Sequence, residues 1–227
     1  MNELLPFEAG RTISSQVYAM LRREIIEHRL KPNLRLSEAS LCEKFNVSRQ
    51  PIREVLLRLS GDKLVQIHPQ RGSFVSPVSL GLFHAAQLIR EAVEVEVISR
   101  VAGTATREII EHLSEELTLQ ETFRANRHFE RFYESDERFH GIIAAGSGIP
   151  VLWSALLEHK IHLDRVRYMA LSHGENLGEL IADHQAIFQA IADRHSEAAM
   201  TAMRRHLRRV LGHTGQLARQ HAEWFSE

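Results

Sequence analysis

Four residues that can bind a metal ion fall on the apolar stripes of predicted helices. They are Asp136, His140, His184 and His206. Side chains on such a stripe face the core, so three helices should bring one carboxylate and three imidazoles together. A buried, ionised carboxylate is costly without a partner, and a divalent cation is a sufficient one. Imidazole nitrogen and carboxylate oxygen suit zinc, our first candidate, with nickel, cobalt and manganese as alternatives.

Each histidine alone has a simpler interpretation. A single inward histidine is more often a core residue with satisfied hydrogen bonds than a metal ligand. The sequence also lacks a short-range motif of the His-Glu-x-x-His type. Asp136 and His140, however, are one helical turn apart, so they can reach the same ion. The four residues together therefore favour a metal site.

Arg90 is an unusual cation on the inner stripe of a helix predicted over 80–102, where its neighbours are apolar. Glu94, one turn later, could pair with it in a purely structural contact. Alternatively, Arg90 binds a ligand carboxylate bidentately beside the metal. A dication, Asp136, Arg90 and Glu94 together carry a formal charge of +1. The ligand expected at this site is therefore a small organic anion.

A second group of polar residues begins at Ser48, which is a natural cap for the start of a helix. Apolar residues recur at helical spacing over 52–59 and predict the buried face of that helix. Arg49, Gln50 and Arg53 then lie on its outer face. A short helix predicted over 38–45 ends just before this one, and the spacing is that of a helix-turn-helix. The second helix of such a unit enters the major groove, where arginine reads guanine.

Two strand-like runs, 64–68 and 73–75, follow the helix-turn-helix. The turn between them contains Arg71 and Gly72, and together they predict a wing. An ordinary helical hairpin with solvated arginines is the alternative interpretation. The coincidence of a helix cap, a basic face and an Arg-Gly wing favours binding to double-stranded DNA.

The charge distribution supports a basic DNA-binding module joined to an acidic one. Residues 1–77 contain 12 Lys and Arg against 8 Asp and Glu, a formal charge of +4, whereas the rest of the chain carries −5. The single cysteine, Cys42, excludes an internal disulfide framework. The sequence shows neither a signal peptide nor an apolar run long enough to span a membrane. We therefore expect a cytoplasmic protein.

The predicted fold is mainly α, with two domains. Residues 1–77 form a winged helix-turn-helix domain, in which a further amphipathic helix packs under the helix-turn-helix, and residues 78–227 form an all-helical domain. The second domain is predicted to contain six helices, over 80–102, 106–125, 128–145, 150–172, 176–192 and 196–222.

Both halves resemble a known family. The DNA-binding half matches the winged-helix signature of GntR-type bacterial transcription regulators, and the helical half is similar to the FCD domain of the FadR-like subclass. The residues that carry the resemblance are Pro32-x-Leu34-x-Leu36-x-Glu38, Val47-Ser48-Arg49-Gln50-Pro51-Ile52-Arg53-Glu54-Val55-Leu56, Pro69-x-Arg71-Gly72-x-x-Val75, Arg90-x-x-x-Glu94, Asp136-x-x-Phe139-His140, the His184 helix and Met203-x-x-His206-Leu207. Asn33 stands where a turn glycine is usual, but asparagine also accepts a positive φ.

The resemblance implies roles for both sets of residues. Arg35, Arg49, Arg53 and the wing at Arg71-Gly72 would contact operator DNA. The Asp and His residues would hold a divalent metal beside a small carboxylate effector. The resemblance further implies a homodimer that binds a palindrome.

We therefore expect a transcription regulator, not an enzyme, whose operator affinity depends on a small organic acid bound at the metal. One alternative is a metal-dependent enzyme acting on such an acid, because a metal with open positions can activate water. Another is a regulator in which the metal is purely structural.

Overall fold

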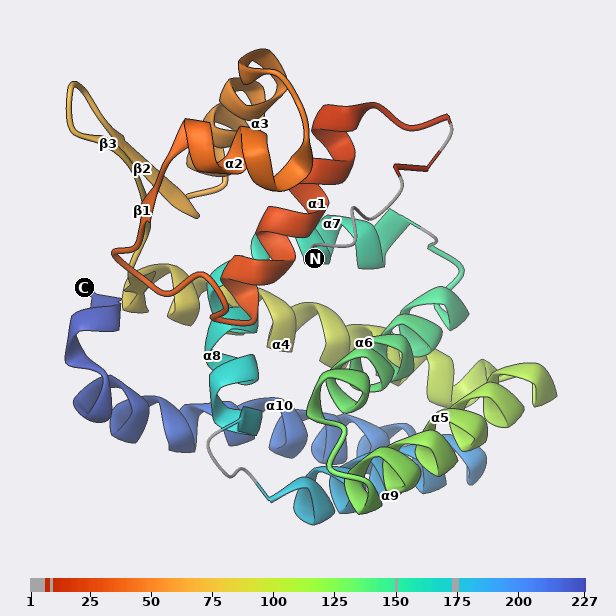
Figure 1. Cartoon of the computed structure of the whole chain (residues 1–227). Helices are drawn as coiled ribbons and strands as arrows, with labels where there is room; N and C mark the ends of the chain where they lie inside the picture. Colours follow the sequence, from red (N-terminus) through yellow and green to blue (C-terminus); the bar gives the residue numbers. More distant parts are fainter. Residues whose placement is uncertain (1–6, 9, 150, 173–175) are drawn as a thin grey trace. The chain divides into compact units, whose positions relative to one another are not determined.

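A computed structural model describes residues 7–8, 10–149, 151–172 and 176–227 (Figure 1). The chain forms two compact units, Met1–Leu80 with His221–Glu227, and Gly81–Gln220. These units differ from the ranges 1–77 and 78–227 mainly at the C-terminus. The last seven residues group with the first unit because the final strand pairs with a strand that precedes the helical domain.

The first unit contains the three helices expected of a helix-turn-helix domain: α1 (Ile13–Ile26), α2 (Glu38–Phe45) and α3 (Arg49–Gly61). The Ser37 hydroxyl caps α2 by accepting a hydrogen bond from the Ser40 amide. Asn46 ends α2 in the left-handed conformation, with φ 51°, and so turns the chain directly into α3. The apolar side chains of α3 that were predicted to be buried, Ile52, Val55, Leu56 and Leu59, are buried.

The wing is an antiparallel hairpin of β2 (Val65–His68) and β3 (Gly72–Val75), as the two strand-like runs predict. The short strand β1 (Arg35–Leu36) completes a three-stranded sheet in the order β1-β3-β2. Its register places Arg35 opposite Phe74. Arg35 thereby lies on the sheet beside the wing.

The C-terminus contributes to the first unit. After a 3-10 turn, Ala222–Trp224, strand β5 (Phe225–Ser226) pairs in parallel with β4 (Val78–Ser79). Two segments almost 150 residues apart in the sequence are thus held side by side.

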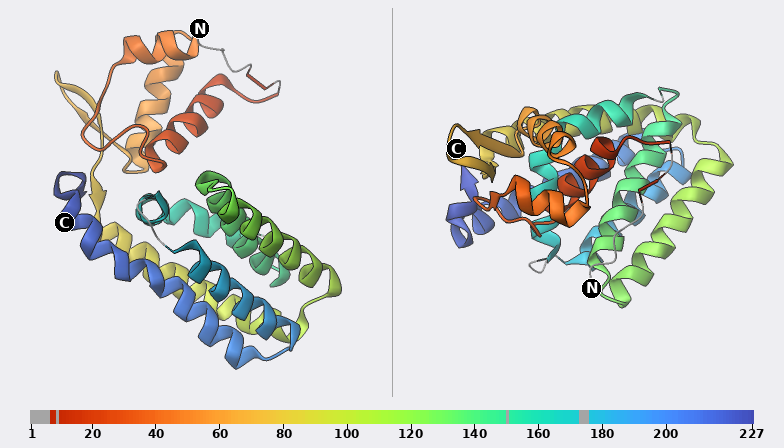
Figure 2. Two further views of the ribbon diagram at one scale, coloured as in Figure 1. Left: turned by 60° about the horizontal axis from the view of Figure 1, so that its bottom comes forward. Right: turned by 45° about the horizontal axis from the view of Figure 1, so that its top comes forward.

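The second unit is all-helical, as predicted, and its helices form a bundle (Figure 2). The described part of the chain contains seven helices there: α4 (Leu80–Thr104), α5 (Arg107–Ala125), α6 (Phe129–Gly146), α7 (Val151–His159), α8 (Ile161–Ser172), α9 (Leu177–Ala192) and α10 (Ser196–Gln220). The prediction of a single helix over 150–172 was wrong, because the chain breaks at Lys160. The predicted start at residue 150 lies outside the described residues.

The main apolar core of the bundle is built from the inner faces of α4, α5, α6, α9 and α10, and includes Ile98, Leu113, Phe139, Ile187 and Met203. A smaller cluster around Phe132 and Leu180 lies on α6, α8 and α9. The polar site described below is therefore surrounded by tightly packed apolar side chains. None of the described helices is long and apolar enough to cross a membrane.

Candidate metal centre and nucleic-acid interface

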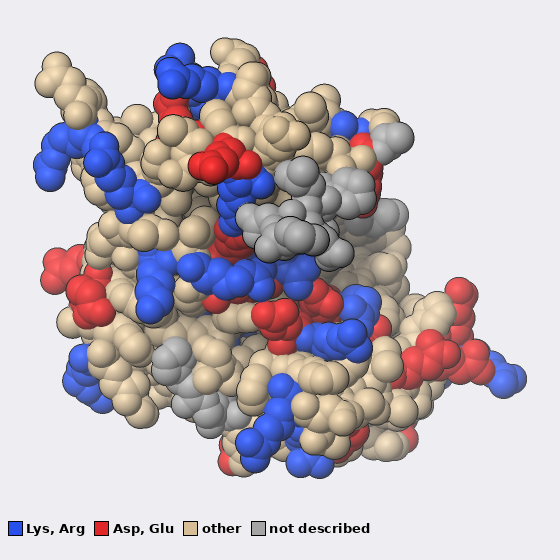
Figure 3. Space-filling model, in the orientation of Figure 1, with Lys and Arg blue, Asp and Glu red and all other residues tan. Residues whose placement is uncertain are grey.

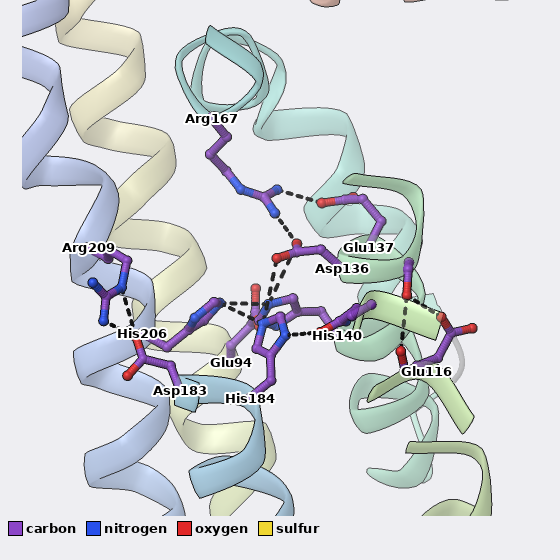
Figure 4. Close-up of polar contacts among 12 residues, drawn as sticks. Glu94, Glu116, Asp136, Glu137, His140, Arg167, Asp183, His184, His206 and Arg209 are labelled. Atoms are coloured by element: carbon purple, nitrogen blue, oxygen red, sulfur yellow. Dashed lines mark hydrogen bonds and ion pairs between the residues drawn. The ribbon is translucent and has the colours of Figure 1, made fainter. Parts of the chain in front are cut away.

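The four residues predicted to bind a metal come together in the bundle, and all four are buried: Asp136, His140, His184 and His206. We call them the His-Asp cluster. One candidate ligand atom from each lies within 4.8 Å of the others (Figure 4). Helix α6 supplies two of the side chains, and α9 and α10 supply one each. The inward stripes of three helices thus meet as the sequence predicts.

Hydrogen bonds orient two of the imidazoles. His140 Nδ1 lies 2.5 Å from the Glu94 carboxylate, and His184 Nδ1 lies 2.7 Å from the Gln120 side-chain oxygen. A carboxylate and an amide oxygen only accept, so each Nδ1 is the donor. In the neutral, metal-binding form of each ring, the Nε2 atom then carries a lone pair. This partner arrangement is typical of histidines that bind a metal.

The three Nε2 atoms converge. His206 Nε2 lies 3.0 Å from His140 Nε2 and 3.2 Å from His184 Nε2. At least two of these atoms present lone pairs, so His206 can donate its one Nε2 hydrogen to only one of them. Lone pairs that face one another at this distance repel, and a cation between them removes the repulsion. The donor set therefore fits a divalent metal.

Burial keeps two of the imidazoles, those of His184 and His206, in their ligand form. It lowers the pKa of His184 to about 3 and the pKa of His206 well below its ordinary value. Burial raises the pKa of Asp136, but Arg167 and the nearby histidines outweigh it, so its pKa is lower than usual. At neutral pH the cluster thus presents the neutral imidazoles of His184 and His206 and the ionised carboxylate of Asp136, the protonation states that bind metals.

Arg167 on α8 is a site residue that the sequence analysis missed. It forms ion pairs with Asp136 and Glu137, the latter at 2.5 Å, and lies above the carboxylate of Asp136 in Figure 4. It thereby holds Asp136 in place from the side opposite the imidazoles. Gln120 was missed as well, although its place on the inner stripe of α5, with Leu113 and Glu116, was a readable signal.

Arg90 combines features of both interpretations given above. It is only 2% exposed, and its Nε donates to Glu94 at 2.5 Å, so the structural pair exists. Its Nη2, however, is buried without a hydrogen-bond partner among the described residues. Burial raises the pKa of Glu94, but Arg90 and His140 outweigh it and hold that pKa at about 2. Glu94 therefore links Arg90 to the His-Asp cluster as a permanent anion.

A pocket lies next to the cluster. Its lining combines three guanidinium groups and the Asp136 carboxylate with apolar side chains: Arg90, Asp136, Arg167, Leu171, Leu180, His206, Leu207, Arg209 and Val210. Arg209 is engaged by Asp183 and Glu179. The pocket therefore offers the unpaired donor of Arg90 beside the His206 imidazole and the Asp136 carboxylate, with further guanidinium groups and apolar side chains around them.

The residues predicted to contact DNA lie on the first unit. Arg35, Arg49 and Gly72 line a hollow between β1, the wing and the beginnings of α2 and α3. Arg35 and Arg49 are exposed. Gly72 has φ +102°, and a Cβ built there would lie 3.2 Å from Arg35 Nε. Glycine thus lets the wing backbone lie against the Arg35 guanidinium.

The other predicted contacts on α3 are exposed and partly held by carboxylates. Arg53 Nε donates to Glu38 at 3.0 Å, and Gln50 Nε2 donates to Glu54 at 3.0 Å. Ser48 occupies the N-cap position, but the predicted hydrogen bond from its hydroxyl to the helix is absent. The first amides of α3 do not use this hydroxyl, which leaves it available to a ligand.

The wing tip at Arg71 is also exposed. In the space-filling view, Lys and Arg side chains gather beside the wing of the first unit, whereas both signs of charge mix over much of the helical unit (Figure 3). This distribution agrees with the opposite net charges of the two sequence halves. Nucleic acid is attracted most strongly where basic side chains gather.

Two family models match the chain. Residues 13–75 match the model described as bacterial regulatory proteins, gntR family, and residues 87–209 match the FCD domain. The HTH-type transcriptional repressor RspR of Escherichia coli K12 is 33% identical over 95% of this chain and 94% of its own length. The galactonate operon transcriptional repressor of the same organism is 26% identical over 83% of this chain and 91% of its own.

Solved structures show the same fold. Escherichia coli McbR/YncC matches with a TM-score of 0.77 and 19% identity, covering 91% of this chain and 98% of that one. A putative GntR regulator from Rhodococcus sp. RHA1 matches with a TM-score of 0.73 and 24% identity, covering 88% and 97%. The chain thus belongs to the gntR family of bacterial regulatory proteins, in the FadR-like subclass with an FCD domain, and is a transcription regulator, not an enzyme.

Proposed function

We propose that a small carboxylate, bound beside a divalent metal in the helical unit, controls the operator affinity of this regulator. The single observation that carries the proposal is the convergence of three imidazole Nε2 atoms next to a buried arginine with an unpaired Nη2. A cation satisfies the imidazoles, and an anion satisfies the arginine. Metal and acid are thus needed at the same place.

Four residues would bind the metal, and two others would orient two of them. Asp136, His140, His184 and His206 would hold the metal, with zinc as the first candidate. A bound metal supplies a positive charge to which a carboxylate oxygen can bind. Glu94 and Gln120 orient the imidazoles of His140 and His184.

On the ligand side, Arg90 would bind the effector carboxylate through its unpaired Nη2. Leu180, Leu207 and Val210 would cover the apolar part of a small acid. Binding would displace water from the apolar part of the wall and would pair a buried cation. Both effects favour an anion with a short carbon chain over an inorganic ion.

On the DNA side, the exposed side chains of Arg35, Arg49, Gln50, Arg53 and Arg71, together with Ser48 and the Gly72 backbone, would contact the operator. Arg49 and Arg53 are on α3, the helix that enters the major groove in this architecture. Effector and operator binding would be coupled by about 1–3 kcal/mol, and the coupling must be reciprocal.

The competing interpretation is that the metal is purely structural. The buried Arg90–Glu94 pair is compatible with it, because such pairs occur without a ligand. The two interpretations differ in one respect. Only a sensor pocket gains stability from a small acid after the metal has been bound.

The deciding experiment is thermal unfolding of the zinc-loaded protein with a panel of small carboxylates. The panel includes galactonate, because one relative is named for a galactonate operon. An acid at 100 times its Kd should add roughly 2.7 kcal/mol. Arg90→Ala should abolish this gain, whereas Arg100→Ala, which removes an exposed arginine of the same helix, should retain it. If no acid stabilises the zinc-loaded protein, the sensor pocket is disproved.

A further inference from the structure

The C-terminal segment His221–Glu227 is bound to the DNA-binding unit by several independent contacts, and we call it the anchor. Phe225 and Ser226 pair with Val78 and Ser79 as parallel strands. The Asn33 side chain donates a hydrogen bond to the Glu223 carbonyl at 2.7 Å. Asn33 itself has φ 66°, so the turn before β1 is shaped to present this amide.

Trp224 is the central side chain of the anchor. The rings of His28 and His221 stack on it, with centroids at 5.3 Å and 4.7 Å, and Lys31 Nζ lies 5.9 Å from its ring. Stacking and cation–π contacts of this kind are attractive beyond the burial of area, because the ring face carries negative charge density. Main-chain pairing, a side-chain hydrogen bond and an aromatic stack thus all hold the last seven residues to the first unit.

The two paired strands continue directly into the two helices that carry the site. Strand β4 is followed at once by α4, with Arg90 and Glu94, and α10, with His206, ends one residue before the anchor. At about 1.5 Å per residue, Arg90 is roughly 15 Å from the start of α4, and His206 is roughly 21 Å from the end of α10. Each helix is an uninterrupted rod over that distance.

The two helices are also tied to each other within the helical unit. Gln87 Nε2 donates to the Leu207 carbonyl at 2.8 Å, and both atoms are buried. Arg208 forms a bidentate pair with Glu91, with the Nη2–Oε1 distance 2.6 Å. Helices α4 and α10 run side by side in the left view of Figure 2. They therefore form one paired element between the site and the strands β4 and β5.

We propose that the anchor is a mechanical connection, by which α10 carries changes at the His-Asp cluster to the DNA-binding unit. Without it, the chain would pass between the two units once, at the β4–α4 connection. With it, both helices that flank the pocket end in strands that are hydrogen-bonded to each other in the DNA-binding unit. The binding of the segment follows from the contacts above, and its part in signalling rests on the proposed metal site.

The first arm tests the attachment and needs no ligand. Amide hydrogen exchange is measured for residues 78–79 and 225–227 in the full-length protein. Trp224→Ala should raise these exchange rates at least tenfold, and Asn33→Gly should raise them several-fold, because glycine retains the positive φ but lacks the donor. Glu227→Gln, at an exposed position outside the contacts, should leave them unchanged. If both Trp224→Ala and Asn33→Gly leave these exchange rates unchanged, the proposal is overturned.

The second arm tests the connection, with zinc ions alone as the probe. Six Gly/Ser residues are inserted between Gln220 and His221, so that the anchor remains bound but no longer follows α10. Zinc should slow exchange at residues 225–227 at least threefold in the wild type and not in this variant. The same insertion between the exposed residues Asn126 and Arg127 is the control, and it should retain the wild-type response.

The two proposals can fail separately. If native mass spectrometry shows bound zinc but residues 225–227 of the wild type do not respond, the mechanical connection is disproved and the metal site stands. An insertion variant that responds as the wild type does would also disprove it. If zinc does not bind the wild type, the proposed metal site is disproved. The signalling role of the anchor is then disproved as well, whatever exchange rates Trp224→Ala and Asn33→Gly show.

Discussion

Gly72 shows how a single residue can position another one for DNA binding. Its φ of +102° is costly for any residue with a Cβ, and a Cβ at this place would lie 3.2 Å from Arg35 Nε. Gly148 also has a positive φ, of +76°, but a Cβ there would meet nothing within 4 Å. The two glycines therefore separate the effect of backbone strain from the effect of a displaced arginine.

We predict that Gly72→Ala and Gly148→Ala both lower the free energy of unfolding, by about 1–2 kcal/mol, because both force alanine into a left-handed conformation. Only Gly72→Ala should also weaken DNA binding, by about tenfold or 1.4 kcal/mol, because it displaces Arg35. The measurements are denaturant unfolding and binding to a duplex that the wild type selects from a random pool. Equal DNA affinity in both variants would show that Arg35 does not contribute to DNA binding.

Glu94 is the residue that links Arg90 to the His-Asp cluster. We predict that Glu94→Gln lowers zinc affinity roughly 10–100-fold, because a neutral amide makes the His140 imidazole a weaker ligand. Competition with a chromophoric chelator measures the affinity. Glu96→Gln, which breaks an exposed pair with Arg100 on the same helix, should bind zinc as the wild type does. Full zinc affinity in Glu94→Gln would mean that Glu94 serves Arg90 alone.

At the scale of residues, the sequence predicted the positions that follow from one helical stripe. Asp136, His140, His184 and His206 are such positions, and their convergence is what the structure shows. Arg167 could not be found in this way, because its role depends on how α8 packs against α6. Glu94 was named as a partner of Arg90, but its contact with His140 joins two helices and has no signal along the chain.

At the scale of elements, Lys160 explains the break that the sequence did not reveal. The apolar stripe continues across it, so periodicity predicts one helix. The Lys160 side chain is fully buried, between Glu137 at 2.7 Å and Asp164 at 2.5 Å, and its carbonyl accepts the first hydrogen bond of α8. Short strands were missed for a related reason. β1 and β5 have two residues each, too few to show a period.

We predict that Lys160→Met lowers the free energy of unfolding at pH 7 by about 3 kcal/mol, because it leaves two buried carboxylates with Arg167 as their remaining cation. Lys44→Met removes an exposed pair with Glu24 and should cost about 0.5 kcal/mol or less. Guanidinium unfolding measures both. A loss of similar size in the two variants would mean that burial of the Lys160 pair adds nothing.

The same network fixes the direction of the pH dependence. Burial raises the pKa of Glu137, but Lys160 and Arg167 outweigh it and hold that pKa below its ordinary value of 4.5. A carboxylate whose pKa is lowered in the folded state stabilises the protein above its unfolded pKa. That contribution should be lost as the pH falls below about 4.5. In Lys160→Met the free energy of unfolding should fall less steeply with pH, because Arg167 is then the one remaining cation of the two that lower the pKa of Glu137 most.

At the scale of the whole molecule, the distribution of charge bears on DNA affinity, and the number of copies of the chain bears on DNA specificity. The positive charge is concentrated in residues 1–77, so the affinity of that part for any DNA is mainly electrostatic and falls with salt. Specific binding needs more, because one recognition helix reads only a few base pairs. A second copy of the chain, related by a two-fold axis, would double the number of base pairs that are read.

We therefore predict a homodimer in solution, with a mass twice the 26.0 kDa of the chain by analytical ultracentrifugation. Duplexes selected from a random pool should be inverted repeats, with half-sites spaced by about one turn of DNA or a multiple of it. Arg53→Ala should relax the choice of base at the same position in both half-sites. Selected sites without two-fold symmetry, bound by a 26.0 kDa species, would instead show that one copy suffices. In that case the effector could act only through changes within a single chain, such as those that the anchor transmits.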